Sequence, residues 1–440
     1  MRSEAGNLFH GMEQKNREFI VKKRIDLIIL GCGARGNCYS AFAAEHPDRV
    51  RVVAVADPRD DQRNMLGDRH GVPEEKRFRS WTDAMKLPKF ADAVAVCTQD
   101  DMHEGPAVAA AERSYHILLE KPMAPTEAAC RRIAESVRKS GVRFAVCHVL
   151  RYTQQTRKIR ELIASGVIGE IVSIQRLESV GYWHQAHSFV RGNWRNESES
   201  SCMLLAKCCH DVDWICYIMN AKCRSVSSFG ALKHFRRGNQ PRGAAERCLE
   251  CPAQIEEKCP YSALKIYLRD RLEKGQTLWP VNILTHDTSR EGVLRALAAG
   301  PYGRCVYACD NDVVDHQVVN FQFEGNRTAS LTMTAFGECG RKTTIFGTRG
   351  SIYADENTLS VFDFLTDRTE VIDLNAPSGT LPASGHGGGD GGIMDAFLTA
   401  VSGGDVSGIL SGVDETLASH LVVFAAERSR LTNRVMELSD

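Results

Sequence analysis

The stretch that decides the fold reads Ile25-Asp-Leu-Ile-Ile-Leu30 and continues as Gly31-Cys-Gly-Ala-Arg-Gly36. The apolar run suits a strand that is buried on both faces, as in a parallel sheet. Gly31 permits a tight turn, Gly33 lets the backbone approach a pyrophosphate, and Gly36 lets the next helix pack closely. That helix would point its free N–H groups and its positive dipole end toward an anion. The motif therefore predicts a dinucleotide pocket.

An acidic residue stands at the distance from the glycines that such a pocket requires. Asp57 ends the apolar segment 51–57 and lies 21 residues beyond Gly36. Its carboxylate is placed to accept hydrogen bonds from ribose hydroxyls. Because a carboxylate repels a 2′-phosphate, we expect NAD rather than NADP. Arg59, two residues further on, could offset the charge of that phosphate and weaken the preference.

Length and charge restrict the kind of protein and ligand. With 440 residues the chain exceeds one ordinary domain, and its 55 Lys and Arg balance its 55 Asp and Glu. No net field attracts nucleic acid or an anionic membrane, so we expect a small-molecule ligand. No segment approaches the roughly 18 apolar residues of a membrane span, and residues 1–23 lack the apolar core of a signal peptide. We expect a cytoplasmic protein with an N-terminal tail at 1–23.

Residues 24–150 alternate strand and helix patterns, which predicts a doubly wound Rossmann domain with a parallel sheet. The expected strands are 25–30, 50–57, 91–98, 116–120 and 142–149. The expected helices are 34–46, 81–86, 103–113 and 125–140. Ligands of such domains bind beyond the carboxyl ends of the strands. Those ends are Gly31, Asp57, Thr98 and Glu120.

Residues 151–440 predict a second, α+β domain, so the whole chain is of the α/β class. After a helix near 154–165, the pattern alternates between apolar and polar residues at 171–177, 315–323, 328–334 and 343–346. Such alternation is typical of a large, mostly antiparallel sheet with one covered face. The other face could form a homodimer or homotetramer. Residues 235–312 read as a long irregular insertion within this domain.

The tripeptide Glu120-Lys121-Pro122, placed between the two domains, resembles a motif of the glucose–fructose oxidoreductase/inositol dehydrogenase (Gfo/Idh/MocA) family. The glycine motif, Asp57 and the segment 204–213 extend this resemblance over 24–440. The family implies NAD(P)-dependent hydride transfer at a carbinol carbon of a sugar or cyclitol, without a catalytic metal. It places the motif lysine, here Lys121, near both nicotinamide and substrate. From the chain alone, Lys121 could also be an ordinary surface lysine.

A second catalytic candidate lies in segment 203–219, which has a helical period with an apolar stripe and a polar face. The family resemblance implies that a histidine of this segment, His210, exchanges the proton of the substrate hydroxyl. The family pattern also carries an aspartate four residues earlier, but that position is Ala206 here. Lys207 or Asp213 could take over the task of orienting His210.

Other residues are expected to hold the ligands. The expected cofactor contacts are Gly31, Gly33, Ala34, Arg35, Gly36, Asp57, Thr98, His103, Glu120, Lys121 and Pro122. Segment 182–195 interleaves aromatic rings with basic and amide groups, which suits a polyhydroxylated or anionic ligand. It could instead be a loop packed against the sheet. The expected substrate contacts are Trp183, His184, Arg191, Trp194, Lys207 and His386.

The insertion holds one cysteine cluster with the spacing of metal ligands, formed by Cys248, Cys251 and Cys259. Structural zinc takes four ligands, and the fourth could be His234, Cys305 or Cys309. The cluster predicts a structural zinc site, with free thiols in the insertion as the alternative.

Taken together, these patterns predict an NAD-dependent oxidoreductase that acts on a sugar, cyclitol or glycoside. One alternative is redox-neutral glycoside cleavage, in which NAD oxidises a sugar hydroxyl, elimination follows, and the hydride returns. Another is a non-catalytic protein that senses the dinucleotide. The presence of both Lys121 and His210 favours an enzyme.

Overall fold

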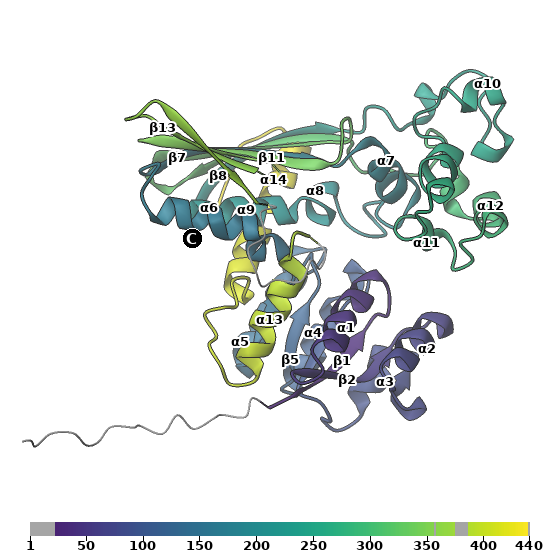
Figure 1. The fold of residues 1–440 in the computed structure, drawn as a ribbon, viewed down its shortest axis with the longest axis horizontal. Coiled ribbons are helices and arrows are strands. Elements are labelled where there is room, and N and C mark those ends of the chain that lie inside the picture. Colours follow the sequence, from purple (N-terminus) through teal and green to yellow (C-terminus); the bar gives the residue numbers. More distant parts are fainter. Residues whose placement is uncertain (1–22, 356–357, 375–385, 439–440) are drawn as a thin grey trace, which may run out of the picture.

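The computed structural model describes residues 23–355, 358–374 and 386–438, which form two domains stacked one above the other in Figure 1. Of the expected N-terminal tail, only Lys23 lies within the described residues. No helix of the described ranges is long and apolar enough to span a membrane.

The first domain is built on a six-stranded parallel sheet in the order β3-β2-β1-β4-β5-β6. Its strands are β1 Ile25–Leu30, β2 Val50–Ala56, β3 Arg77–Phe78, β4 Ala93–Val96, β5 His116–Leu119 and β6 Phe144–Val146. Its helices are α1 Ala34–Glu45, α2 Asp60–Arg69, α3 Trp81–Lys86, α4 Glu104–Glu112 and α5 Glu127–Ser140. The strand order reverses between β1 and β4, and ligands bind at such a switch point.

The second domain contains a nine-stranded mixed sheet in the order β14-β13-β12-β11-β7-β10-β9-β8-β15. Its strands are β7 Ile171–Ser179, β8 Cys223–Ala231, β9 His316–Phe323, β10 Arg327–Thr334, β11 Gly340–Gly347, β12 Gly350–Ala354, β13 Thr358–Asp363, β14 Arg368–Asp373 and β15 Met436–Glu437. Among the paired strands of the described sheet, β7 and β10 alone run parallel. In β9 every second residue is buried, as the alternating sequence predicts.

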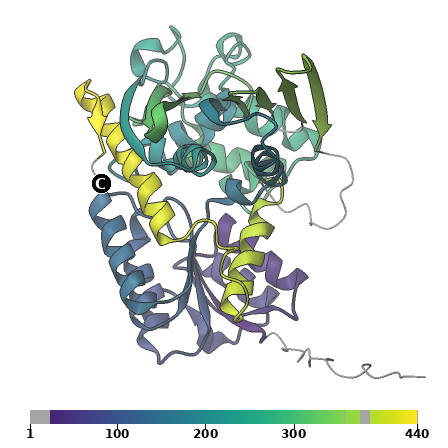
Figure 2. The same cartoon turned by 90° about the vertical axis from the view of Figure 1, so that its left-hand side faces the viewer.

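Helices cover one face of this sheet (Figure 1). They are α6 Gln154–Ala164, α8 Met203–Ala206, α9 Cys209–Met219 and α14 Val413–Thr432. Figure 2 shows α14 continuing from the second domain down beside α5, and its Leu417 joins the core of the first domain. Helix α13, Gly389–Val401, lies entirely against the first domain, where Ile393 and Phe397 are fully buried. The C-terminal part of the chain thus returns to the first domain and contributes to its core.

The insertion forms a lobe beside the sheet, on the right in Figure 1. It contains the short helices α10 Ala253–Glu256 and α11 Val281–Leu284 and the longer α12 Arg290–Ala299. The lobe has a separate hydrophobic core, which includes Phe235, Tyr261 and Tyr267. Parts of the segment 182–191 also belong to this core. That segment consists of α7, Tyr182–His184, and a π-helix, Gln185–Arg191.

Segment 203–219 is not the single helix that its period predicts. Helix α8 ends at Ala206 and α9 begins at Cys209, with Lys207 between them. The polar face is also more buried than expected, since Asp211 is fully buried. Ion pairs with Arg176 and Arg341 compensate the charge of Asp211, so the buried face of α9 accommodates a carboxylate.

Candidate active site

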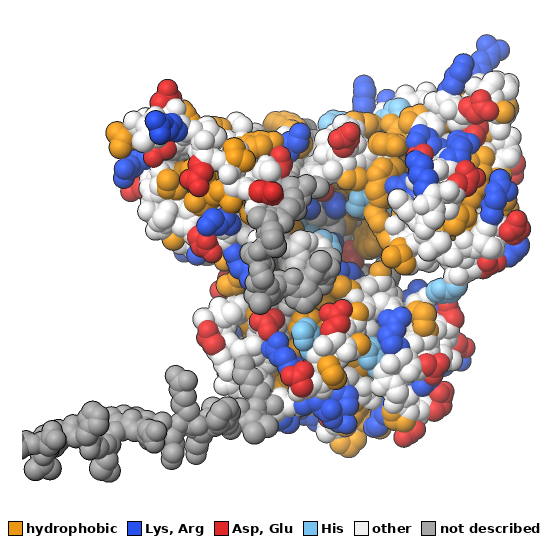
Figure 3. Space-filling view, in the orientation of Figure 1, with side chains coloured by type: hydrophobic (Ala, Val, Ile, Leu, Met, Phe, Trp, Pro, Cys, Tyr) orange, Lys and Arg blue, Asp and Glu red, His pale blue; other side chains and the backbone are white. Residues whose placement is uncertain are grey.

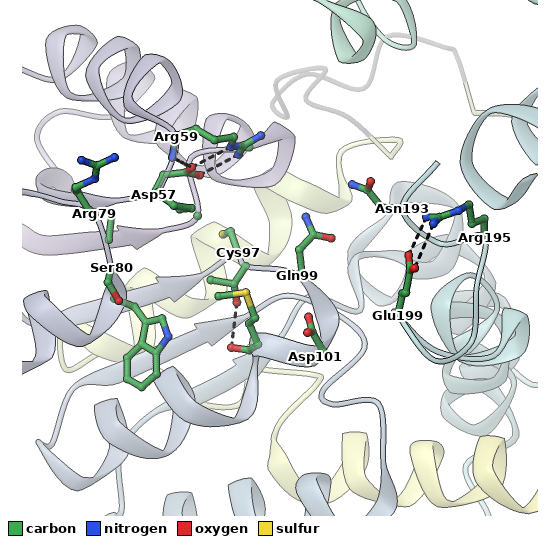
Figure 4. A pocket seen from close by; sticks show the side chains of 17 residues that line it. Asp57, Arg59, Arg79, Ser80, Cys97, Gln99, Asp101, Asn193, Arg195 and Glu199 are labelled. Carbon is green, nitrogen blue, oxygen red and sulfur yellow. Dashed lines mark hydrogen bonds and ion pairs between the residues drawn. The ribbon is translucent and has the colours of Figure 1, made fainter. Parts of the chain in front are cut away.

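A cavity of about 660 Å³ opens at the carboxyl ends of β1, β2 and β4 (Figure 4). Its lining combines residues of both domains: Gly31, Gly33, Ala56, Asp57, Pro58, Arg59, Arg79, Ser80, Trp81, Cys97, Thr98, Gln99, Asp101, Met102, Asn193, Arg195 and Glu199. The last three come from the second domain and face the first across the cavity in Figure 4. Sequence patterns pointed to segment 182–195 as ligand-binding but not to a place on this cavity.

The glycines of the first turn fit a phosphate-binding loop. Gly31 has φ +93°, and a Cβ there would lie 2.3 Å from the carbonyl oxygen of Cys97. A Cβ on Gly36 would lie 2.0 Å from the carbonyl oxygen of Gly31. A Cβ on Gly33 would meet only the Arg59 guanidinium, at 3.6 Å, so this backbone is open to the cavity. No side chain caps the N-terminus of α1. Its free N–H groups therefore suit the pyrophosphate of a dinucleotide.

Asp57 is already engaged by protein groups. Its carboxylate accepts hydrogen bonds from the Arg59 Nε and Nη2, each at 2.9 Å, and from the backbone N–H of Cys32 at 2.8 Å. Burial by itself would raise the pKa of Asp57, but the hydrogen bonds from Arg59 and Cys32 hold it below its usual value. The carboxylate is therefore ionised, and the guanidinium beside it carries a positive charge that would offset that of a 2′-phosphate.

Exchanging Asp57 should change the choice of cofactor. In Asp57→Asn the negative charge is lost and Arg59 is released, so we expect the ratio of NADP to NAD affinity to rise by at least about 10-fold. Dissociation constants of both cofactors, measured by calorimetry, test this. Arg59→Ala in the wild-type background should not produce that rise. Equal affinity of the wild type for NAD and NADP would contradict the role of Asp57.

Other expected cofactor contacts support the loop rather than line the cavity. Arg35 makes an ion pair with Glu120 at 2.5 Å and another with Asp390 of α13 at 2.6 Å. His103 is fully buried, with Nδ1 2.7 Å from the carbonyl oxygen of Pro122 and Nε2 3.1 Å from that of Thr98. These contacts fix the ends of β1, β4 and β5 relative to one another. Ala34, Gly36 and Lys121 are likewise outside the cavity lining.

Lys121 reaches from the first domain into the second. Its Nζ donates a hydrogen bond of 2.8 Å to the carbonyl oxygen of Ala206, at the carboxyl end of α8. Its backbone N–H donates to Glu120 Oε2 at 3.0 Å. The ammonium group is thus held by a backbone carbonyl at the position where the family pattern has an aspartate.

His210 lies on α9, the helix that follows α8, and is close to Lys121. Its side chain is 8 % exposed, and its Nδ1 has no hydrogen-bond partner in the described structure. Its ring centroid is 5.8 Å from that of His148 and 6.4 Å from that of His386. Burial, and after it the positive charge of Lys121, lowers the pKa of His210 well below 6.5. A neutral imidazole can accept a proton from a hydroxyl.

The two residues that could replace the missing aspartate have other partners. Asp213 forms an ion pair with Arg151, with Nε and Oδ2 2.7 Å apart. Lys207 lies 3.3 Å from the buried Glu178. The ring of His148 lies near both His210 and Asp213. Its centroid is 5.8 Å from that of His210, and its Nδ1 is 3.6 Å from Asp213 Oδ2.

The expected substrate contacts fall into two groups. His386 hydrogen-bonds to Asp390 at 3.0 Å, and its ring centroid lies 6.4 Å from that of His210. Trp183 stacks on His184 with centroids 5.7 Å apart. Trp194, in contrast, donates through Nε1 to Asp100 of the first domain at 3.2 Å. Arg191 is only 1 % exposed.

Arg191 binds inside the insertion rather than at the cleft. It donates hydrogen bonds to the carbonyl oxygens of Arg304 and Tyr261, at 2.7 and 2.8 Å. The sequence predicted that Arg191 contacts the substrate. Its side chain instead lies inside the insertion, where its donors satisfy buried carbonyl groups.

The expected structural zinc is not supported. Cys248, Cys251 and Cys259 line one small cavity together with Cys305, but no group of three or more His, Cys, Asp or Glu among the described residues is arranged to hold a metal ion. The Cys248 sulfur instead accepts from the backbone N–H of Ala263 at 3.4 Å. The insertion also contains a hydrophobic core.

Several buried histidines predict a dependence of stability on pH. Burial lowers the pKa of His148 to about 4 and that of His420 to about 3. Between these values and 6.5 the unfolded chain binds protons that the folded chain does not, so stability falls as pH falls. Each histidine contributes up to about 1.4 kcal/mol per pH unit. We expect the urea midpoint to drop between pH 7 and 5, and His148→Phe to flatten that slope. An unchanged midpoint would contradict this account.

The sequence matches one family over both domains. Residues 25–148 match the description "Oxidoreductase family, NAD-binding Rossmann fold", and residues 160–438 match "Oxidoreductase family, C-terminal alpha/beta domain". The protein YteT of Bacillus subtilis (strain 168) is 26% identical over 336 residues, which are 72% of this chain and 74% of YteT. A 2,7-anhydro-N-acetylneuraminate hydratase of Escherichia coli (strain K12) is 26% identical over 202 residues, 46% of this chain and about half (51%) of the hydratase.

The fold is shared with solved structures. A levoglucosan dehydrogenase in complex with NADH superposes with a TM-score of 0.69 at 18% identity, over 95% of this chain and 100% of that one. The two matched ranges agree with the doubly wound domain and the mixed-sheet domain described above.

Proposed function

The chain belongs to the Gfo/Idh/MocA oxidoreductase family, and on that premise we propose that it transfers a hydride between NAD and a carbinol or carbonyl carbon of a sugar, cyclitol or glycoside. The observation that carries the proposal is the meeting of Lys121 and His210. They come from different domains, and Lys121 is bonded to the carbonyl of Ala206, four residues before His210. Like the contact of Lys121 with Ala206, the cavity proposed for the dinucleotide lies between the two domains.

The residues of the cleft have separable roles in the proposed reaction. NAD, when bound along the open backbone of Gly33, supplies the hydride acceptor. The Lys121 ammonium stabilises the substrate oxygen as its negative charge develops. The neutral His210 imidazole accepts the hydroxyl proton during oxidation and returns it during reduction. His210 is buried and Lys121 partly buried, which strengthens these charge interactions.

A panel of sugars, cyclitols and simple glycosides tests the proposal. Purified protein with NAD should form NADH with at least one member, and the matching ketone should consume NADH. A protein that binds NAD but neither oxidises nor reduces any member would be a dinucleotide sensor rather than an enzyme.

A second candidate is a redox-neutral reaction in which the hydride returns to the substrate. It is favoured by the relationship to the 2,7-anhydro-N-acetylneuraminate hydratase, although the match covers about half of that protein. Ala206 at the position of the family aspartate is also compatible with this reaction, because the side chains available for acid–base catalysis then differ from the usual family set. Loss of a glycoside without net NADH, but with transient bound NADH, would identify it.

A further inference from the structure

The insertion brings an aromatic wall and an arginine to the edge of the cleft. The ring of Trp279 lies 5.1 Å from that of Trp183 and 5.0 Å from that of His184, centroid to centroid. The Arg271 guanidinium lies 3.9 Å from the centroid of Trp183. Trp279 remains 47% exposed and its neighbour Leu278 75% exposed. Figure 3 shows hydrophobic side chains gathered on the side of the hollow that the insertion forms.

His184 connects this wall to the charged groups of the cleft. Burial, and next the positive charge of Lys207, lowers the pKa of His184 well below 6.5, with Arg341 and Lys121 contributing in the same direction. These three cations therefore lie near the ring that Trp279 contacts.

A buried ion-pair network lies near His184. In it the carboxylates of Glu178 and Asp211 pair with Lys207, Arg341 and Arg176. Within this network two anions pair with three cations. The excess positive charge favours a ligand that brings a negative charge of its own.

Arg271 adds a further cation without an acid partner. Its Nη1 donates to the carbonyl oxygen of Ile266 at 2.7 Å, and no ion pair joins it to a carboxylate among the described residues. The neighbouring Asp270 is instead paired with Lys265. A guanidinium that stacks on a ring and keeps donors free suits a planar carboxylate, which it can bind through two parallel hydrogen bonds.

We propose that Trp183, Trp279 and Arg271 form a subsite for a substrate that carries a carboxylate, that is, a sugar acid or its glycoside. The apolar face of the sugar ring packs on the tryptophans, and Arg271 binds the carboxylate. The choice of a sugar as the ligand rests on the proposed function. The subsite itself is defined by ligand binding, which can be measured without turnover. It also gives the insertion a role in the choice of substrate.

Matched pairs of sugars test the subsite: glucose with glucuronate, galactose with galacturonate, and mannose with mannuronate. Binding to the NAD-loaded protein is measured by calorimetry, so the result does not depend on turnover. In at least one pair the acid should bind at least about 10-fold more tightly than its neutral partner. Arg271→Met should remove this difference while leaving the neutral sugar within about 2-fold. Trp279→Ala should weaken both members of the pair.

Arg290→Met is the matched control, because Arg290 is exposed and its ion pair with Glu273 spans 3.9 Å. This substitution changes the net charge of the protein by the same amount as Arg271→Met. It should leave the preference for the acid over the neutral sugar unchanged. Three results would overturn the subsite: no acid binds better than its neutral partner, the preference survives Arg271→Met, or glucose 6-phosphate binds more tightly than every acid. Preference for an acid without NADH formation would retain the subsite and reject the proposed hydride transfer.

Discussion

Lys121→Met should reduce turnover by about 10² to 10³-fold while NAD still binds. Methionine keeps much of the length of the lysine side chain but removes the ammonium that stabilises charge on the substrate oxygen. Lys121 is outside the lining of the cofactor cavity, so the dissociation constant for NAD should change little. Steady-state rates and NAD binding, measured on the same preparation, separate the two effects.

Lys86→Met is the control for this substitution. Lys86 is exposed, and its partner is Asp83 one helical turn away. The same chemical change at that surface site should leave the rate unaltered. If Lys121→Met retained nearly wild-type turnover, charge stabilisation by Lys121 would be excluded.

His210→Asn should lower the rate by about 10² to 10⁴, the usual effect of removing a positioned acid–base group. Asparagine keeps a polar side chain in the buried position but cannot exchange the proton. His316→Asn, at a partly exposed ring that pairs with Asp315, serves as the control. A His210→Asn variant with a normal rate would remove His210 from the mechanism.

The pH profile provides an independent reading of His210. Since burial and Lys121 lower its pKa below 6.5, His210 stays neutral, and able to accept a proton, on the acid side of that value. The rate of oxidation should therefore remain level as pH falls through 6.5 and decline only at lower pH. A decline centred at 6.5 would point to an ordinary exposed histidine.

Lys207→Ala distinguishes two ways of replacing the family aspartate. If Lys207 orients His210, its loss should damage the rate nearly as much as His210→Asn. The structure pairs Lys207 with Glu178, and its charge contributes to the surroundings of His184. We therefore expect a smaller loss in the rate and a larger rise in KM for substrate.

The fold was largely predictable from local sequence. The buried run of β1 and the glycines after it specify a strand, a tight turn and a helix within a few residues, and the family and fold class expected from them are confirmed. The alternation in β9 similarly marks one face of a sheet. Such signals are local, so no distant contact is needed to interpret them.

Features that depend on distant packing were not predictable. The placement of Asn193 and Arg195 on the cavity at the ends of β1, β2 and β4 results from the docking of two domains. Arg191 belongs to the same polar segment, yet it turns into the insertion to satisfy the carbonyl of Tyr261. The break between α8 and α9 allows Lys207 to approach Glu178 on β7. None of these outcomes leaves a pattern in the adjacent sequence.

The most direct test of the central claim follows the hydride itself. The protein is mixed with NAD and the best-bound sugar carrying deuterium at each carbinol carbon in turn, and the cofactor is then examined by mass spectrometry. The account predicts that one labelled position transfers its deuterium to the nicotinamide in the wild type and that Lys121→Met abolishes the transfer. Binding of both ligands without deuterium in the cofactor from any position would contradict it.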